Sequence, residues 1–243
     1  MFTNTGLEAR DDPRFRPRQM LSERRMCMYT TMMGLSAGAG LILVALLGRE
    51  LHRGEVASLD GWALALGTAG VLLAVSGLHM VLTQSIGLEG EQFKNEFFGG
   101  LTAPFGFLLI AAAIFLWRRG DDLLARPDPV GRLYAAAGPP AVLVLGLGLS
   151  LIAVTVAAFQ HEIFATAPVQ EPILGTAPKW LVNAGLSSLF GLPGVGATLA
   201  PIGVWLRNRP LMAISGVAFT AAGAGWMLTG ALVYYTHIGM AFV

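Results

Sequence analysis

Three histidines are the side chains of this sequence best suited to bind a metal or to move protons. His79, His161 and His237 each fall near one end of a long apolar stretch. Acidic residues occur close to them in the sequence, at Glu89, Glu91, Glu96, Glu162 and Glu171. Imidazole binds transition metals and titrates near neutral pH, so a shared transition-metal or haem site is one interpretation. The other is that each histidine bonds a carbonyl or water where its apolar stretch ends.

Glycine and proline form a second candidate site. The segments FFGGLTAPFGF and LFGLPGVGATLAP carry proline inside apolar stretches, where it removes a helical hydrogen bond, and neighbouring glycine eases unwinding. Paired broken helices at matching places hold the binding site in transporters. The alternative is that kinks only shape the bundle. The candidate substrate-binding residues are Gly99, Pro104, Gly106, Gly191, Pro193 and Pro201.

The residues motivate no enzyme activity. The sequence contains no Gly-rich phosphate loop with lysine, no HExxH motif and no GxSxG motif. Ser76, Ser150 and Ser215 lie in apolar segments with no base nearby in the sequence. The single cysteine, Cys27, excludes an intrachain disulfide and a CxxC site. Apart from the haem or metal interpretation, no cofactor is predicted.

The composition predicts that lipid surrounds this chain. Of its 243 residues, 54% are hydrophobic and only 13% are charged. A soluble domain of this length needs more charge to cover its surface. A net charge of +1 gives no reason to expect nucleic acid. We therefore expect the lipid bilayer as the main partner and the cell membrane as the location.

Six apolar segments are long enough to cross a bilayer, which takes about 20 helical residues. They run near residues 29–48, 61–83, 98–117, 134–160, 180–206 and 211–242. They lack the alternation of a barrel strand, and in lipid their backbone groups must bond within the segment, so they are expected to be helices. The prediction is an all-α, polytopic transmembrane bundle of about six spans at residues 29–243, after a polar, Arg-rich N-terminal tail at residues 1–28.

Spans three and five match at one constant offset, which indicates an internal repeat of spans two-three and four-five. The matching pairs are Ala112/Ala200, Ile114/Ile202, Trp117/Trp205, Arg119/Arg207, Leu123/Leu211 and Ala125/Ala213. Glycines inside spans, such as Gly34 and Gly38, favour close helix packing in lipid. Trp226 lies deep in the last span, where we expect it to pack between helices.

The charges give two opposing indications of orientation. With six spans, both termini lie on one side of the membrane, which we call the tail side. The loops on the opposite side carry eight arginines, which favours placing those loops in the cytoplasm and the termini outside. The N-terminal tail itself carries six arginines, which favours the reverse.

The stretch GLHMVLT at residues 77–83, followed by KNEFFGGLTAPFGFLLIAAAIFLWRR, resembles an uncharacterised bacterial and archaeal membrane family, domain of unknown function 981. The resemblance covers spans two and three. The family pattern has Glu-Pro after the first Phe-Gly, where this chain has Gly100 and Leu101, so no role of that glutamate carries over. The resemblance implies a multi-span membrane protein and no established activity.

Three functions are compatible with these residues. The first is a non-catalytic subunit that packs with other membrane subunits in a larger assembly, such as a respiratory or other energy-converting complex, because the spans are free of charge and rich in small residues. The second is a transporter or carrier of a small uncharged or lipid-like molecule that binds at the proline-containing spans. The third is a redox protein with a histidine-bound metal or haem.

Overall fold

The computed structural model describes residues 15–85, 93–165 and 177–240, with side chains described for 29, 31–85, 93–165 and 177–235. This part of the chain is all-helical and has no strand. Its helices are α1 (Phe15–Arg53), α2 (Asp60–Thr83), α3 (Phe93–Leu124), α4 (Pro129–Ala137), α5 (Ala141–Gln160), α6 (Lys179–Trp205) and α7 (Arg209–Met240). The all-α prediction is therefore confirmed.

Six of these helices are long and apolar enough to cross a membrane. Their apolar segments are Thr31–Arg53, Asp60–Thr83, Phe93–Leu124, Ala141–Gln160, Lys179–Trp205 and Arg209–Tyr235. The predicted bundle of about six spans is confirmed, and the chain is a multi-pass membrane protein. Two helices are clearly longer than the predicted spans: α1 begins at Phe15, inside the predicted tail, and ends at Arg53, and α3 extends to both sides of 98–117.

The fourth predicted span, 134–160, is divided in the structure. The helix α4 ends at Ala137, and α5 begins at Ala141, after Pro139 and Pro140. Proline lacks the N–H that a continuing helix requires, so two consecutive prolines separate the helices. The start of α4 is capped by Asp128, whose carboxylate accepts a hydrogen bond from the Gly131 N–H at 2.9 Å. Only α5 crosses the apolar layer.

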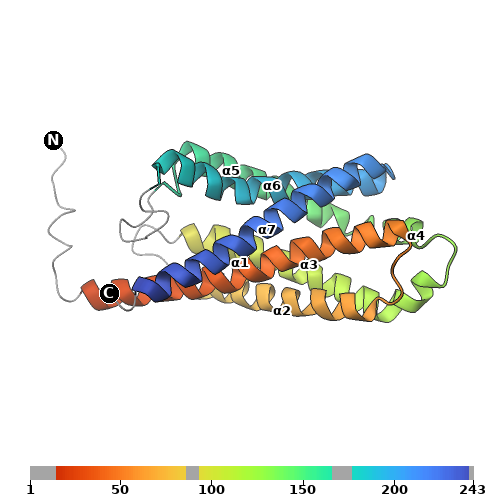
Figure 1. Ribbon diagram of the computed structural model, residues 1–243, viewed down its shortest axis with the longest axis horizontal. Coiled ribbons are helices and arrows are strands. Elements are labelled where there is room, and N and C mark those ends of the chain that lie inside the picture. The colour runs from red at the N-terminus through yellow and green to blue at the C-terminus, as the bar shows by residue number, and fades with distance from the viewer. Residues whose placement is uncertain (1–14, 86–92, 166–176, 241–243) are drawn as a thin grey trace.

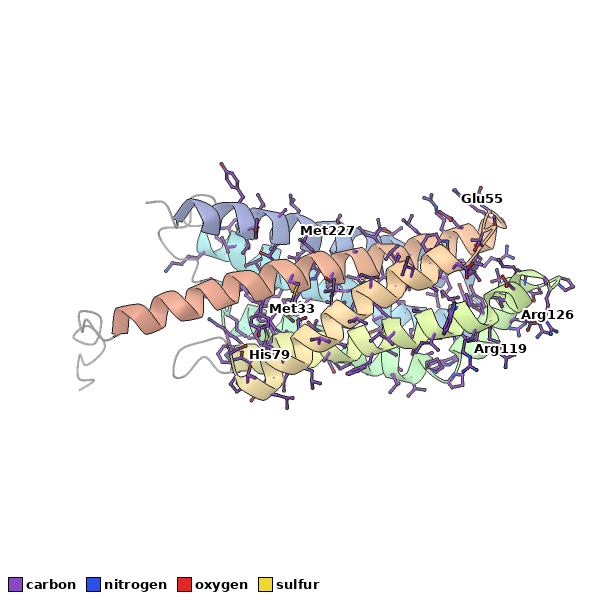
Figure 2. All side chains as sticks on the ribbon, turned by 90° about the horizontal axis from the view of Figure 1, so that it is seen from below. Met33, Glu55, His79, Arg119, Arg126 and Met227 are labelled. Carbon is purple, nitrogen blue, oxygen red and sulfur yellow. The ribbon has the colours of Figure 1, made fainter. Side chains whose placement is uncertain are left out.

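The six long helices run along the long axis of the molecule (Figure 1), and their contacts arrange them in a ring in the order α3, α2, α1, α7, α6, α5. Neighbours along this order pack closely, whereas α3 and α5, which close the ring, touch at few places. The chain direction alternates around the ring. We call the end where α1, α3 and α6 begin the tail end. Figure 2 shows Glu55, Arg119 and Arg126 at the opposite end, which we call the arginine end, and His79 toward the tail end.

Glycine allows very close approach in each of three antiparallel helix pairs, α2/α3, α5/α6 and α7/α1. A Cβ added to Gly70 would lie 2.8 Å from the Gly106 oxygen, one added to Gly148 would lie 2.7 Å from the Thr198 nitrogen, and one added to Gly223 would lie 2.6 Å from the Gly38 oxygen. Real Cβ atoms do not approach backbone atoms this closely. Backbones in contact bring many atoms within van der Waals range, which holds helices together in lipid.

The three helix pairs share one contact register. Gly70 and Gly106 of α2/α3 correspond to Gly148 and Gly194 of α5/α6, and to Gly223 and Gly38 of α7/α1. Neighbouring contacts repeat in the same register, namely Gly77–Ala103, Thr155–Gly191 and Gly230–Leu35. The first two pairs follow the offset of the predicted repeat. The third pair joins the two ends of the chain, so the ring is a pseudo-threefold arrangement of three helical hairpins.

The threefold arrangement is loosest between α3 and α5. The corresponding contacts in the other two hairpin junctions, α1 with α2 and α7 with α6, are extensive. In the most apolar part of α5 only 11% of the residues are buried, compared with 44% in α2, the helix at the corresponding position. Fewer residues of α5 than of α2 are therefore buried, and the other residues of α5 are half-buried or exposed.

Candidate functional site

A small, partly open cavity lies inside the ring, in the half nearer to the tail end. Its volume is about 50 Å³. Five helices line it, α1, α2, α3, α6 and α7, with the side chains of Met33, Ala37, Met80, Phe98, Thr102, Phe190 and Trp226 and with Gly34. The wall is thus almost entirely apolar, with two thioethers, three aromatic rings and a single hydroxyl.

The cavity lies where the three hairpins meet. Gly34, Thr102 and Phe190 line it from α1, α3 and α6, and they occupy the same position of the three hairpins in the shared contact register. About two turns further along these helices, the corresponding residues Leu41, Leu109 and Ala197 are all buried. The axis of the ring is therefore packed toward the arginine end and hollow beside Thr102.

A tryptophan fixes one wall of the cavity. Trp226 of α7 donates a hydrogen bond from its Nε1 to the carbonyl oxygen of Leu189 in α6, at 2.8 Å. In a regular helix this carbonyl would accept from the residue four positions later, which is Pro193 and has no N–H. The indole ring also packs edge-on against Phe190, with ring centres 5.1 Å apart. The expectation that Trp226 packs between helices is confirmed.

Aromatic rings cover the cavity where it faces the tail end. Phe164, just after α5, stacks on Phe190 with ring centres 5.7 Å apart and planes 4° apart, and it also contacts Phe97 and Phe98. The backbone N–H of Phe164 donates to the side-chain oxygen of Asn183 at 3.1 Å. Asn183 is 5% exposed at the start of α6. This hydrogen bond places the Phe164 ring beside two residues of the cavity wall.

The three candidate histidines have different surroundings. The His79 Nδ1 is hydrogen-bonded to the hydroxyl of Tyr29 in α1, and the two rings stack with centres 5.9 Å apart. His161 is exposed at the end of α5. The side chain of His237 lies outside the described residues. Among the residues whose side chains the structure describes, no group of three histidine, cysteine or acidic side chains could hold a metal ion.

The glycines and prolines predicted to bind substrate lie at helix contacts. Gly99 and Gly106 face α2, and Gly191 faces Thr155 of α5. Pro193 and Pro201 of α6 are buried. Pro104 is exposed on α3. None of the six lines the cavity. The expectation of broken spans is wrong, because α3 and α6 run as continuous helices through all three prolines.

The residues that do line the cavity gave little signal in the sequence. Met33, Met80 and Thr102 resemble ordinary residues of an apolar span, and only a comparison of all three hairpins would have placed Thr102 on the axis. Trp226 is the exception, because a tryptophan deep in a span needs a hydrogen-bond partner for its N–H. Pro193, four residues after Leu189, was the sequence signal for that partner, since it leaves the Leu189 carbonyl without a helical donor.

A second histidine–tyrosine pair lies at the arginine end. The Tyr134 hydroxyl of α4 is 2.9 Å from His52 Nε2, and His52 Nδ1 is 2.8 Å from the Gly48 oxygen. Because Nδ1 must donate to the carbonyl, Nε2 accepts from the tyrosine. Burial raises the pKa of Tyr134 above its ordinary value of 10.0, and the positive charge of Arg209 opposes this shift. The pair anchors α4 to α1.

Comparison with known proteins gives one match. A family model described as a protein of unknown function, DUF981, matches residues 26–240, which is most of the chain and includes all six spans. No curated protein and no solved structure matches.

Proposed function

We propose a function from the premise that this chain belongs to the DUF981 family, whose members are described as proteins of unknown function. In this proposal the protein acts as a non-catalytic subunit that packs against another membrane protein through α5. The assembly lies in the cell membrane, and a respiratory or other energy-converting complex is the class that suits a subunit without charged groups in the interior of its spans. The low burial of α5 carries the proposal.

The surface of α5 suits a helix better than lipid alone. Gly146, Ser150 and Ala153 form an exposed strip of small residues, and a Cβ added to Gly146 would meet nothing within 4 Å. Leu149 and Val156, 54% and 49% exposed, flank the strip. Small residues let a second backbone approach closely, and larger side chains beside them provide contact area. The corresponding helix α2 packs against α1 as well as α3, and its residues at the equivalent positions, Thr68, Leu72 and Val75, are also exposed.

Photo-crosslinking in native membranes tests this role. A photoreactive amino acid at Leu149 should give one dominant crosslinked partner, and the same amino acid at Val217, which is 69% exposed on α7, should give none. Gly146→Leu should abolish the product because its side chain blocks close approach. Gly216→Leu is the matched control, since it too has open space around it. Equal, partner-free labelling at Leu149 and Val217 would show that α5 faces only lipid.

A carrier of a small uncharged molecule is the second candidate, and the cavity on the axis favours it. Movement along the axis would have to pass the packed residues Leu41, Leu109 and Ala197. Uptake into vesicles should then fall when Ala197→Phe narrows this passage. Uptake that is unchanged by this variant would remove the axial route. The histidine-bound metal or haem gains no support from the described side chains.

A further inference from the structure

We propose that the axial cavity is a binding site for a small, uncharged, mostly apolar molecule that carries one hydrogen-bonding group. The site is independent of the proposed docking surface, because α5 does not line the cavity. A cavity needs at least about 10–15 Å³ of this kind of volume to hold one water. A volume of about 50 Å³ therefore has room for a small molecule of a few non-hydrogen atoms.

The composition of the wall defines the class of ligand. Thioether and aromatic side chains, from Met33, Met80, Phe98, Phe190 and Trp226, provide polarizable contact, and methionine adapts its shape to the guest. No charged residue lines the cavity, so an ion would lose its hydration without gaining a partner. Binding sites of this kind are mostly apolar and use a few polar groups for orientation.

Thr102 provides the polar group. Most serines and threonines inside the helices donate to a carbonyl one turn earlier, as Thr68 does to Leu64 and Thr198 to Gly194. Thr102 lines the cavity, and among the described residues its hydroxyl makes no hydrogen bond. An unpartnered hydroxyl in an apolar wall is stabilised by a ligand that bonds it. The ligand's polar group is therefore assigned to the α3 side of the cavity.

The site is preformed. The Trp226 indole is held by its bond to the Leu189 carbonyl, and Phe190 is held between Trp226 and Phe164. Met33 and Met80 are 6% and 2% exposed and pack against Tyr29 and Phe98. Because these walls are fixed before binding, little conformational entropy is lost when a ligand enters.

Phe164 controls entry in this proposal. Its ring covers Phe98 and Phe190 from the tail side, and its backbone is tied to α6 only by the bond to Asn183 among the described residues. The residue lies outside the regular helices, where motion is least restricted. A small ligand would enter from the tail end when this ring swings aside.

Methyl NMR on methionine-labelled protein in lipid nanodiscs tests the site. Xenon probes the space, and propan-2-ol, with four non-hydrogen atoms, probes the space together with the hydroxyl. Both should shift the methyl signals of Met33 and Met80 in a saturable way. The methyl of Met212, which packs against Gly203 at the start of α7 near the arginine end, is the internal control for partition into the bilayer. Shifts at Met33 and Met80 that rise linearly, as at Met212, would overturn the proposal.

Two substitutions at one position separate space from hydrogen bonding. Thr102→Val keeps the shape and should weaken propan-2-ol binding about fivefold while leaving xenon binding unchanged. Thr102→Leu fills the cavity and should abolish both saturable shifts. Phe164→Ala should speed the exchange of propan-2-ol between its free and bound states, and unchanged exchange would show that Phe164 does not control entry. Undiminished binding to Thr102→Leu, with the protein still folded by its methyl spectrum, would place the ligand elsewhere and refute the assignment.

Discussion

The hydrogen bond between Trp226 and the Leu189 carbonyl should depend on Pro193. The carbonyl is available to the indole because Pro193 has no N–H to donate to it. Trp226→Phe retains a ring against Phe190 and removes the donor. In the Pro193→Ala background, the alanine N–H can complete the helical bond to Leu189, so the loss of the indole should matter less.

The size of this dependence follows from the environment of the carbonyl. A buried acceptor without a partner costs about 1–3 kcal/mol. Hydrogen bonds between membrane helices contribute about 0.6 kcal/mol on average and at most about 1.7 kcal/mol. The bond is 2.8 Å long and lies beside Phe190, which is 5% exposed, so we expect a coupling energy above this average, about 1 kcal/mol. Trp226→Phe also loses ring volume, but this loss is the same in both backgrounds and therefore cancels from the coupling energy.

A double-mutant cycle measures this coupling directly. The free energy of unfolding of the four proteins would be obtained from helicity in mixed micelles as the fraction of denaturing detergent rises. The loss caused by Trp226→Phe should be about 1 kcal/mol smaller in the Pro193→Ala background than in the native one. If the two substitutions are additive within error, the proline does not create the acceptor, and the reasoning about α6 fails.

Two further predictions use the same unfolding assay. Gly38→Leu should destabilise the protein by about 1–3 kcal/mol, since its Cβ would lie 2.5 Å from the Gly223 oxygen. Gly146→Leu is the control and should be neutral, because Gly146 has open space around it. Equal effects of the two substitutions on the free energy of unfolding would contradict the argument that Gly38 is needed for close helix contact. The raised pKa of Tyr134 means that the fold favours the neutral phenol, so this contribution is complete below pH 10.0 and is lost as the pH rises through the raised value. Tyr134→Phe should therefore flatten the loss of stability above pH 10.0, and an unchanged alkaline profile would assign that loss to other groups.

The spans were predictable from the sequence because hydrophobic length alone determines them. The division of the fourth span was not predicted, although its cause is local: the consecutive prolines Pro139 and Pro140 remove two neighbouring helical hydrogen bonds. The prolines of α3 and α6 were harder to interpret. Whether a proline breaks a membrane helix depends on what satisfies the carbonyl four residues before it, and for Pro193 this partner is Trp226, from another helix.

The arrangement of the hairpins was only partly predictable. The offset between spans three and five identified two hairpins, because both helices of each pair are consecutive in the chain. The third pair joins α1 to α7, and nothing in the local sequence indicates that helices so far apart are partners. The cavity depends on all three pairs, so neither Met33 nor Thr102 could be assigned to a site before that pairing was known.

The pairing of the first helix with the last also determines how the protein must be assembled. The α2/α3 and α5/α6 pairs can form as each second helix leaves the ribosome, whereas α1 enters the bilayer first and its glycine face meets no partner until α7 has been translated. A ribosome that stalls before α7 leaves α1 as an orphan helix with a face adapted to close contact, which a membrane quality-control protease can recognise. Fusing the two termini and opening the chain between α3 and α4 would make all three pairs sequential, and such a permuted chain should mature faster than the native one.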